Sequence, residues 1–88
     1  MKIKENFALR QVAGAWVVLP LASATLNFNG MLSLNESGVL LWKALENGCD
    51  KKALIKVLTD EYDVTDEVVS ADVDEFLQTL RKAGCLEE

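Results

Sequence analysis

The chain has 88 residues, of which 50% are hydrophobic and 26% are charged. This length predicts a single domain over residues 1–88, and the apolar fraction favours a compact fold over disorder. No apolar run reaches the roughly 18–20 residues that a membrane span needs, and the N-terminus lacks the apolar stretch of a signal peptide. We therefore expect a cytoplasmic protein that does not contact membranes.

The net charge of −5 is spread unevenly along the chain. Residues 1–45 contain four basic and two acidic residues, whereas residues 46–88 contain five basic and twelve acidic residues. An acidic surface repels the phosphates of nucleic acids, so nucleic-acid binding is disfavoured. Two interpretations stay open for the second half: an acidic, solvated surface, or a preference for basic peptide or protein partners.

The residues that commonly perform chemistry are few. The chain has two cysteines, Cys49 and Cys85, and no histidine. This composition excludes zinc sites built from Cys and His, and it excludes Cys–His and Ser–His–Asp catalysis. We expect both thiols to be reduced and at least partly buried. The acidic residues form no complete EF-hand loop, so we predict no catalytic residue, no metal site and no cofactor.

The first third of the chain predicts two hairpins. Phe7–Val12 and Ala15–Leu19 are rich in apolar and β-branched residues, and Pro20 should end their pairing because it has no N–H to donate. Further along, Asn29-Gly30 is typical of a type I′ turn between Thr25–Phe28 and Met31–Leu34. We therefore predict a three-stranded antiparallel sheet, with the last strand exposed at an edge.

Three helices should follow the strands. The first begins after Asn35 and ends near Glu46; the second, KKALIKVLTDEY, follows Cys49 or Asp50 as its cap; the third follows Thr65 and is ended by Gly84. Trp42 should lie in the core. The third helix has an apolar stripe at helical spacing, made of Val69, Val73, Phe76, Leu77 and Leu80. Strands followed by helices predict an α+β fold.

The edge strand and the third helix together predict a peptide-binding surface. An exposed strand offers unpaired N–H and C=O groups to an extended peptide. One flank of the third helix carries apolar, small and acidic side chains beside the core stripe, with Ala83 at its end and Val68, Asp72, Glu75 and Thr79 along it. Trp16 and Phe28 could either pack in the core or line such a groove.

The order and spacing of four segments resemble the PqqD-like family: GAWVVLPL, NGMLSLNESGVLLWKALENG, EYDV and DVDEFLQTLRKAGCL. The resemblance covers the chain from about Phe7 to Leu86. It implies a RiPP recognition element, a winged-helix-like domain with three strands and three helices. Such domains bind the leader of a ribosomally made precursor peptide and present it to a modifying enzyme, often a radical SAM enzyme.

In this family the leader adds as a strand and lies against the third helix, which here runs from Asp66 to Ala83. Carried over by position, and combined with the helix flank and Phe76, the predicted peptide-binding residues are Met31, Leu32, Ser33, Leu34, Val68, Asp72, Glu75, Phe76 and Thr79. We expect no enzymatic activity of its own.

Two alternatives remain, and both use the same elements. The chain could be a protein-docking or dimerisation module that pairs through its edge strand, although we expect a monomer or a weak dimer. A winged-helix regulator that binds DNA is less favoured, because the third helix offers only Arg81 and Lys82 against five acidic residues.

Overall fold

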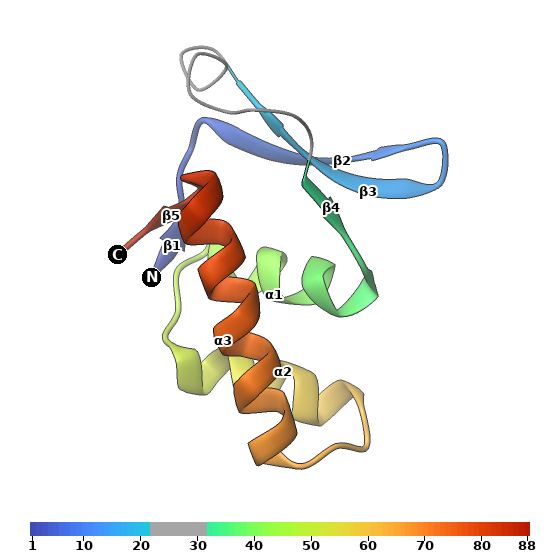
Figure 1. Cartoon of the computed structure of the whole chain (residues 1–88), viewed down its shortest axis with the longest axis vertical. Helices are drawn as coiled ribbons and strands as arrows, with labels where there is room; N and C mark the ends of the chain where they lie inside the picture. Colours follow the sequence, from blue (N-terminus) through green and yellow to red (C-terminus); the bar gives the residue numbers. More distant parts are fainter. Residues whose placement is uncertain (22–31) are drawn as a thin grey trace.

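The computed structural model describes residues 1–21 and 32–88. Its elements are, in chain order, β1 (Lys2–Ile3), β2 (Phe7–Val12), β3 (Ala15–Pro20), β4 (Leu32–Leu34), α1 (Glu36–Glu46), α2 (Lys51–Glu61), α3 (Asp66–Ala83) and β5 (Leu86–Glu87). Figure 1 shows the sheet on one side of the three helices, with the turn of the β2–β3 hairpin reaching beyond them. The predicted α+β order of a three-stranded sheet followed by three helices is confirmed.

The main sheet is antiparallel with the order β2-β3-β4. The first predicted hairpin is confirmed: Val12 pairs with Ala15, so Ala13 and Gly14 form a two-residue turn. Both have positive φ angles, 52° and 82°, which matches the right-handed twist of the flanking strands. β3 ends at Pro20, as expected for a residue without an N–H.

β4 is the short strand that was predicted at the sheet edge. It pairs with β3 through Trp16↔Leu34, Val17↔Ser33 and Val18↔Leu32. The other half of the predicted second hairpin, Thr25–Phe28 with the Asn29-Gly30 turn, lies outside the described residues, and so does Met31.

Each helix begins at a side-chain cap that the sequence predicted. Asn35 Oδ1 accepts from the N–H of Gly38 at 2.9 Å, and Asp50 Oδ1 accepts from the N–H of Ala53 at 2.9 Å. Thr65 Oγ1 accepts from the N–H of Val68 at 3.4 Å. Such caps satisfy amide groups that have no partner within the helix. Gly84, with a φ of 76°, ends α3 in a left-handed conformation.

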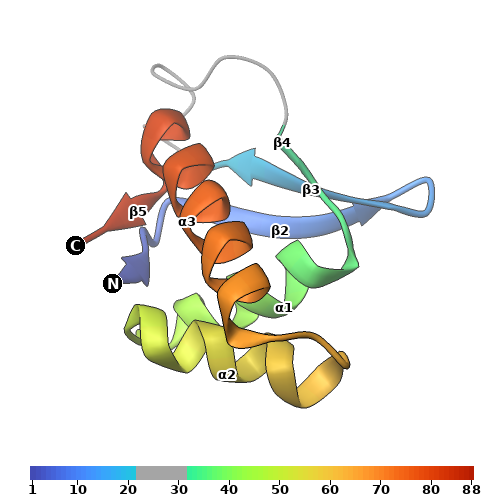
Figure 2. The same cartoon turned by 60° about the horizontal axis from the view of Figure 1, so that its bottom comes forward.

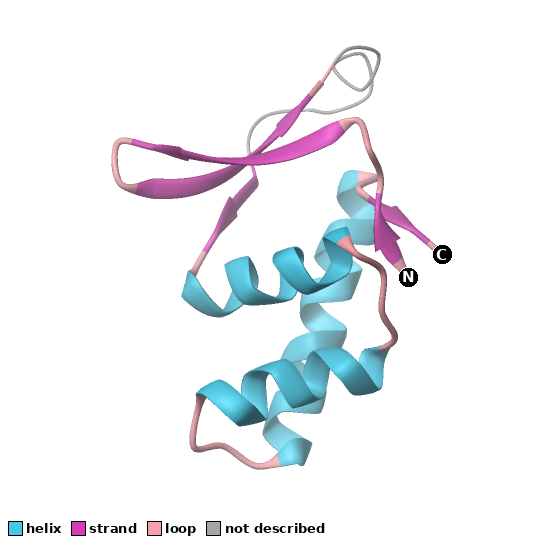
Figure 3. Ribbon diagram, turned by 180° about the vertical axis from the view of Figure 1, so that it is seen from behind, coloured by secondary structure: helices cyan, strands magenta, loops and turns pink. Residues whose placement is uncertain are grey.

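The helices pack under the sheet around one core. Figure 2 shows α1 between the sheet and α2, with α3 crossing in front of them, and Figure 3 shows from behind that α1 and α2 both lie across α3. The largest fully buried side chain is Trp42 on α1, as predicted. Around it lie buried residues from all three helices, β3 and both ends of the chain: Ile3, Val18, Leu41, Leu45, Leu54, Leu58, Val69, Val73, Leu77, Leu80, Cys85 and Leu86.

A second, two-stranded sheet joins the two ends of the chain, which the sequence analysis did not predict. β1 pairs antiparallel with β5, with Ile3 opposite Leu86. Cys85 and Leu86 fold back onto the core, as expected, and both cysteines are free thiols. No helix of the described ranges is long and apolar enough to cross a membrane.

Candidate functional site

A groove of about 520 Å³ separates β4 from α3. β4 and the start of α1 form one side, and α3 forms the other. Its lining comes from four elements and the residue that joins two of them: Leu32, Ser33, Leu34, Asn35, Ser37, Gly38, Leu41, Leu58, Asp72, Glu75, Phe76 and Thr79. Elements far apart in sequence therefore share one open hollow.

The β4 side of the groove presents strand backbone. β4 pairs with β3 on one side, and no described strand lies on its other side. Leu32 and Leu34 are half-buried against the core, while Ser33 between them is exposed, so the side chains alternate as in a regular strand. An extended peptide could form main-chain hydrogen bonds with this open edge.

On the same side of the groove as β4 lies the junction between β4 and α1. The strand ends at Leu34, and Asn35 begins the helix at once, with Oδ1 accepting from the Gly38 N–H and, at 3.0 Å, from the Ser37 hydroxyl. Gly38 is buried and has no side chain to fill the space beside the Phe76 ring. This junction holds the strand edge at a defined position relative to the helices.

The α3 side of the groove is one flank of the helix. Asp72, Glu75 and Thr79 are exposed and follow one another at helical spacing, and the Thr79 hydroxyl donates to the Glu75 carbonyl at 3.1 Å. Phe76 was expected in the core but is only half-buried, because its ring also lines the groove. The flank thus combines an aromatic surface with two carboxylates.

The groove carries negative charge that is not neutralised within it. Its only charged lining residues are Asp72 and Glu75, and neither forms an ion pair among the described residues; residues 22–31 contain no charged residue at all. Three cations of the described residues, Lys51, Lys56 and Arg81, pair with acids that do not line the groove.

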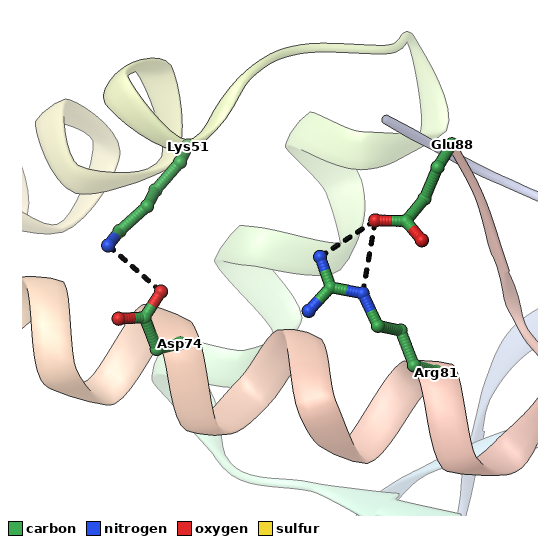
Figure 4. A network of polar contacts seen from close by, with 4 residues as sticks. All are labelled: Lys51, Asp74, Arg81 and Glu88. Atoms are coloured by element: carbon green, nitrogen blue, oxygen red, sulfur yellow. Dashed lines mark hydrogen bonds and ion pairs between the residues drawn. The ribbon is translucent and has the colours of Figure 1, made fainter.

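Figure 4 shows two of these pairs. Lys51 on α2 lies 2.9 Å from Asp74, and Arg81 lies 2.7 Å from Glu88, whose pKa is lowered by the hydrogen bond that it accepts. A ligand with positive charge would therefore complement the groove.

The structure brings together seven of the nine predicted site residues around this groove: Leu32, Ser33, Leu34, Asp72, Glu75, Phe76 and Thr79. Met31 lies outside the described residues. Val68 does not line the groove; it lies in the first turn of α3 and leaves 54% of its surface exposed, so its contact with a peptide stays a prediction.

Sequence reasoning missed the lining that comes from α1 and α2. Asn35 was recognised only as a helix cap, and Ser37, Gly38, Leu41 and Leu58 were not considered for the site. The spacing of Gly38 and Leu41 places them on one side of α1, which is a signal that could have been used. Which side faces α3 depends on tertiary packing, and the pattern of a single helix does not contain it.

The other aromatic candidate, Trp16, lies outside the groove. It is half-buried on β3, and Lys43 Nζ lies 5.4 Å from the centre of its ring. The described residues contain no group of three or more His, Cys, Asp or Glu side chains that could hold a metal ion.

Comparison with known proteins identifies the family. The model of the family described as coenzyme PQQ synthesis protein D (PqqD) matches residues 15–86. The chain belongs to the PqqD family. The matched range begins at β3 and extends into β5, so it includes every described residue that lines the groove. The predicted family is thus confirmed.

Two solved structures resemble this PqqD-family chain over nearly its whole length. One is TbiB1 in complex with the TbiA(beta) leader peptide: 25% of residues are identical, the TM-score is 0.78, and the match covers 99% of this chain and 95% of that one. The other is lasso peptide synthetase B1 complexed with the leader peptide, at 20% identity, a TM-score of 0.76 and coverage of 99% and 96%. No curated protein matches the chain.

Proposed function

We propose that this chain is a RiPP recognition element, a non-catalytic adaptor domain over residues 1–88 that binds the leader of a ribosomally made precursor peptide. The leader adds as a strand to the open edge of β4 and lies in the groove against α3. The observation that carries this proposal is the groove of about 520 Å³ itself, which lies between a helix flank and a strand edge that pairs with no strand of the described residues. The leader-bound complexes of TbiB1 and of lasso peptide synthetase B1 support it.

Strand addition accounts for how such a site binds an extended peptide. The three residues of β4 offer about 10 Å of backbone at 3.3–3.4 Å per residue, enough to align a short segment in one register. Main-chain hydrogen bonds supply affinity that tolerates many sequences. Selectivity then comes from the groove, where Phe76 can contact an apolar side chain and Asp72 and Glu75 favour a basic one.

The adaptor presents the bound leader to a peptide-modifying enzyme, which we propose to be a radical SAM enzyme on the family resemblance. Binding takes place in the cytoplasm, where the precursor is synthesised. Asp72 and Glu75 are the only charged groups in the described lining of the groove, and this lining contains no histidine, cysteine or lysine that could act beside them as a nucleophile or base. We therefore assign it to recognition.

Two proline variants test strand addition. Successive residues of a strand direct their N–H groups to opposite sides, so one of Leu32 and Ser33 donates to the open edge and the other towards β3. The proline that removes the outward N–H should weaken leader binding more than tenfold, with the circular dichroism spectrum unchanged. The proline that removes the inward N–H should instead disturb pairing with β3.

Binding is measured by fluorescence anisotropy with a labelled leader from a precursor encoded near this gene, and sedimentation is run in parallel. If both variants keep the native spectrum and bind the leader as wild type does, strand addition is wrong. A tight dimer that the outward proline dissociates would support the docking alternative, because the edge would then be occupied by a second copy.

A further inference from the structure

A second hollow of about 340 Å³ adjoins the groove beyond the end of β4. It lies between the start of α1, the end of α2 and the first half of α3, and it shares four lining residues with the groove. The complete lining is Asn35, Glu36, Ser37, Leu58, Tyr62, Val64, Val69 and Asp72. Because Asn35, Ser37, Leu58 and Asp72 line both hollows, a peptide that leaves the groove at Leu34 passes directly over the second one.

The second hollow has an apolar interior and an acidic rim. Leu58 and Val69 are buried at its base, Tyr62 is half-buried, and Val64 leaves 42% of its surface exposed. Glu36 and Asp72 are exposed, and neither has a cationic partner among the described residues. The Glu36 carboxylate is close enough to act on Tyr62: burial raises the pKa of the Tyr62 hydroxyl, and the charges of Glu36 and Glu61 raise it further.

We propose that this hollow binds a lysine or arginine side chain of the same leader peptide, an inference that rests on the proposed function. The aliphatic part of such a side chain packs against Tyr62 and Val64, while its charged end stays near the water between Glu36 and Asp72. The Tyr62 ring adds attraction for a cation that lies over its face.

Other kinds of side chain fit this lining less well. A purely apolar side chain would cover the two carboxylates without pairing them, and desolvated, unpaired charge is unfavourable. An acidic side chain would be repelled by both. The basic residue should lie next to the segment paired with β4, on its N-terminal side if the peptide runs antiparallel to β4 and on its C-terminal side if it runs parallel.

Small probes test the hollow without a leader peptide. The isotopically labelled protein is titrated with N-acetyl-L-arginine amide. Separate titrations use the citrulline analogue, which is polar but uncharged, and the norleucine analogue, which is apolar. Amide shifts at Glu36, Tyr62 and Val64 should reach saturation at a concentration of the arginine probe that is about twofold to fivefold lower than for either analogue. That ratio is about what one exposed ion pair contributes.

Two glutamate variants on the same helix give a matched comparison. Glu36→Gln should reduce the preference for arginine over citrulline, because only Asp72 then remains, while Glu46→Gln, at the opposite end of α1, should leave the preference unchanged. Equal shifts with norleucine and arginine would show an apolar hollow and overturn the proposal. The absence of any shift at Tyr62 and Val64 would also overturn it, because the hollow would then bind none of the probes.

The outcomes separate this inference from the proposed function. If a leader peptide binds β4 but the arginine probe does not shift Tyr62, the recognition element stands and the basic subsite is wrong. If the arginine probe binds but no leader peptide does, the hollow does bind basic side chains, but the proposed function is wrong and the leader is not their source. A charge swap tests the hollow with a bound leader. Replacing the leader's basic residue beside the paired segment by Glu should lower its affinity for the wild-type protein more than its affinity for the Glu36→Lys variant.

Discussion

The missing side chain of Gly38 sets the shape of the groove. A Cβ at this position would lie 3.2 Å from Asn35 Oδ1 and 3.4 Å from both Leu34 Cβ and Phe76 Cε1. Asn35 is held by its capping hydrogen bonds and Leu34 by the sheet, whereas the half-buried Phe76 ring has open groove on its other side. A Cβ here would therefore crowd Asn35 most and fill the space beside the Phe76 ring.

We predict that Gly38→Ala weakens leader binding by about threefold to tenfold, because the added methyl group occupies the groove beside Phe76 and crowds Asn35; overpacking of this kind costs about 1 kcal/mol or somewhat more. The fold should not be lost, since alanine favours a helix over glycine by about 1 kcal/mol. Calorimetric titration measures the affinity, and thermal unfolding measures the stability.

A second substitution distinguishes the groove from a general effect on the helix. Gly38→Ala combined with Phe76→Leu should recover part of the lost affinity, because the smaller side chain makes room again. Unchanged affinity in the single variant would show that this part of the groove does not contact the leader.

At the residue scale the sequence predicted capping better than depth of burial. Asn35, Asp50 and Thr65 all cap their helices as expected, because a cap depends on residues three positions away. Phe76 was assigned to the core stripe of α3 from its spacing, and the structure leaves it half-buried. Spacing gives the direction of a side chain, but its depth depends on Gly38, a residue of another helix.

At the scale of elements, α3 performs two tasks with two sides. One side holds the buried stripe of Val69, Val73, Leu77 and Leu80, and the adjoining flank presents Asp72, Glu75 and Thr79 to the groove. Since the buried stripe anchors the helix, changes on the flank should alter binding more than folding.

We predict that Asp72→Lys weakens the binding of a basic leader by about fivefold or more at low salt, because it replaces attraction by repulsion inside the groove. The difference from wild type should shrink as the salt concentration rises, since exposed charges are screened. Affinities measured by fluorescence anisotropy across a salt series check both statements.

Glu67→Lys is the matched control for this prediction. It makes the same change of charge on α3 but does not line the groove. Equal losses of affinity in Asp72→Lys and Glu67→Lys would mean that binding depends on the overall charge of the helix rather than on a contact in the groove. Affinity that does not depend on salt would argue against the acidic flank.

The strands were less predictable than the helices. The hairpin of β2 and β3 follows from β-branched residues and a two-residue turn, which are local signals. β1 and β5 have two residues each and join the two ends of the chain, so no local sequence pattern predicts their pairing. The same applies to the groove, whose two sides are more than thirty residues apart in sequence.

At the scale of the whole molecule, the chain ends complete the core. Ile3, Cys85 and Leu86 are buried, the Lys4 N–H donates to the Cys85 carbonyl at 2.9 Å, and the Cys49 N–H donates to the Met1 carbonyl at 2.9 Å. Burial raises the pKa of the Cys85 thiol to about 11 from its ordinary value of 9.0, and Lys4 opposes the shift only in part. The folded protein thus favours a neutral thiol.

This burial predicts a loss of stability in alkali. Because the pKa of Cys85 is raised in the folded state, the thiol's contribution to the free energy of unfolding is complete well below pH 9 and is lost as the pH rises towards 11. Between pH 8 and pH 10.5 the free energy of unfolding should fall by about 2 kcal/mol more in wild type than in Cys85→Ala. Urea denaturation of both proteins at each pH, in the presence of a reducing agent, measures the free energy of unfolding. Parallel pH dependence of the two proteins would contradict the prediction.

The central claim is that β4 and α3 together hold a leader peptide. The most direct test is an amide NMR titration of the isotopically labelled protein with leader peptides encoded near its gene. We predict shifts concentrated at Leu32–Leu34 and at the groove flank of α3, from Asp72 to Thr79. A folded, monomeric protein that responds to none of these peptides, or whose shifts lie away from the groove, would contradict the account.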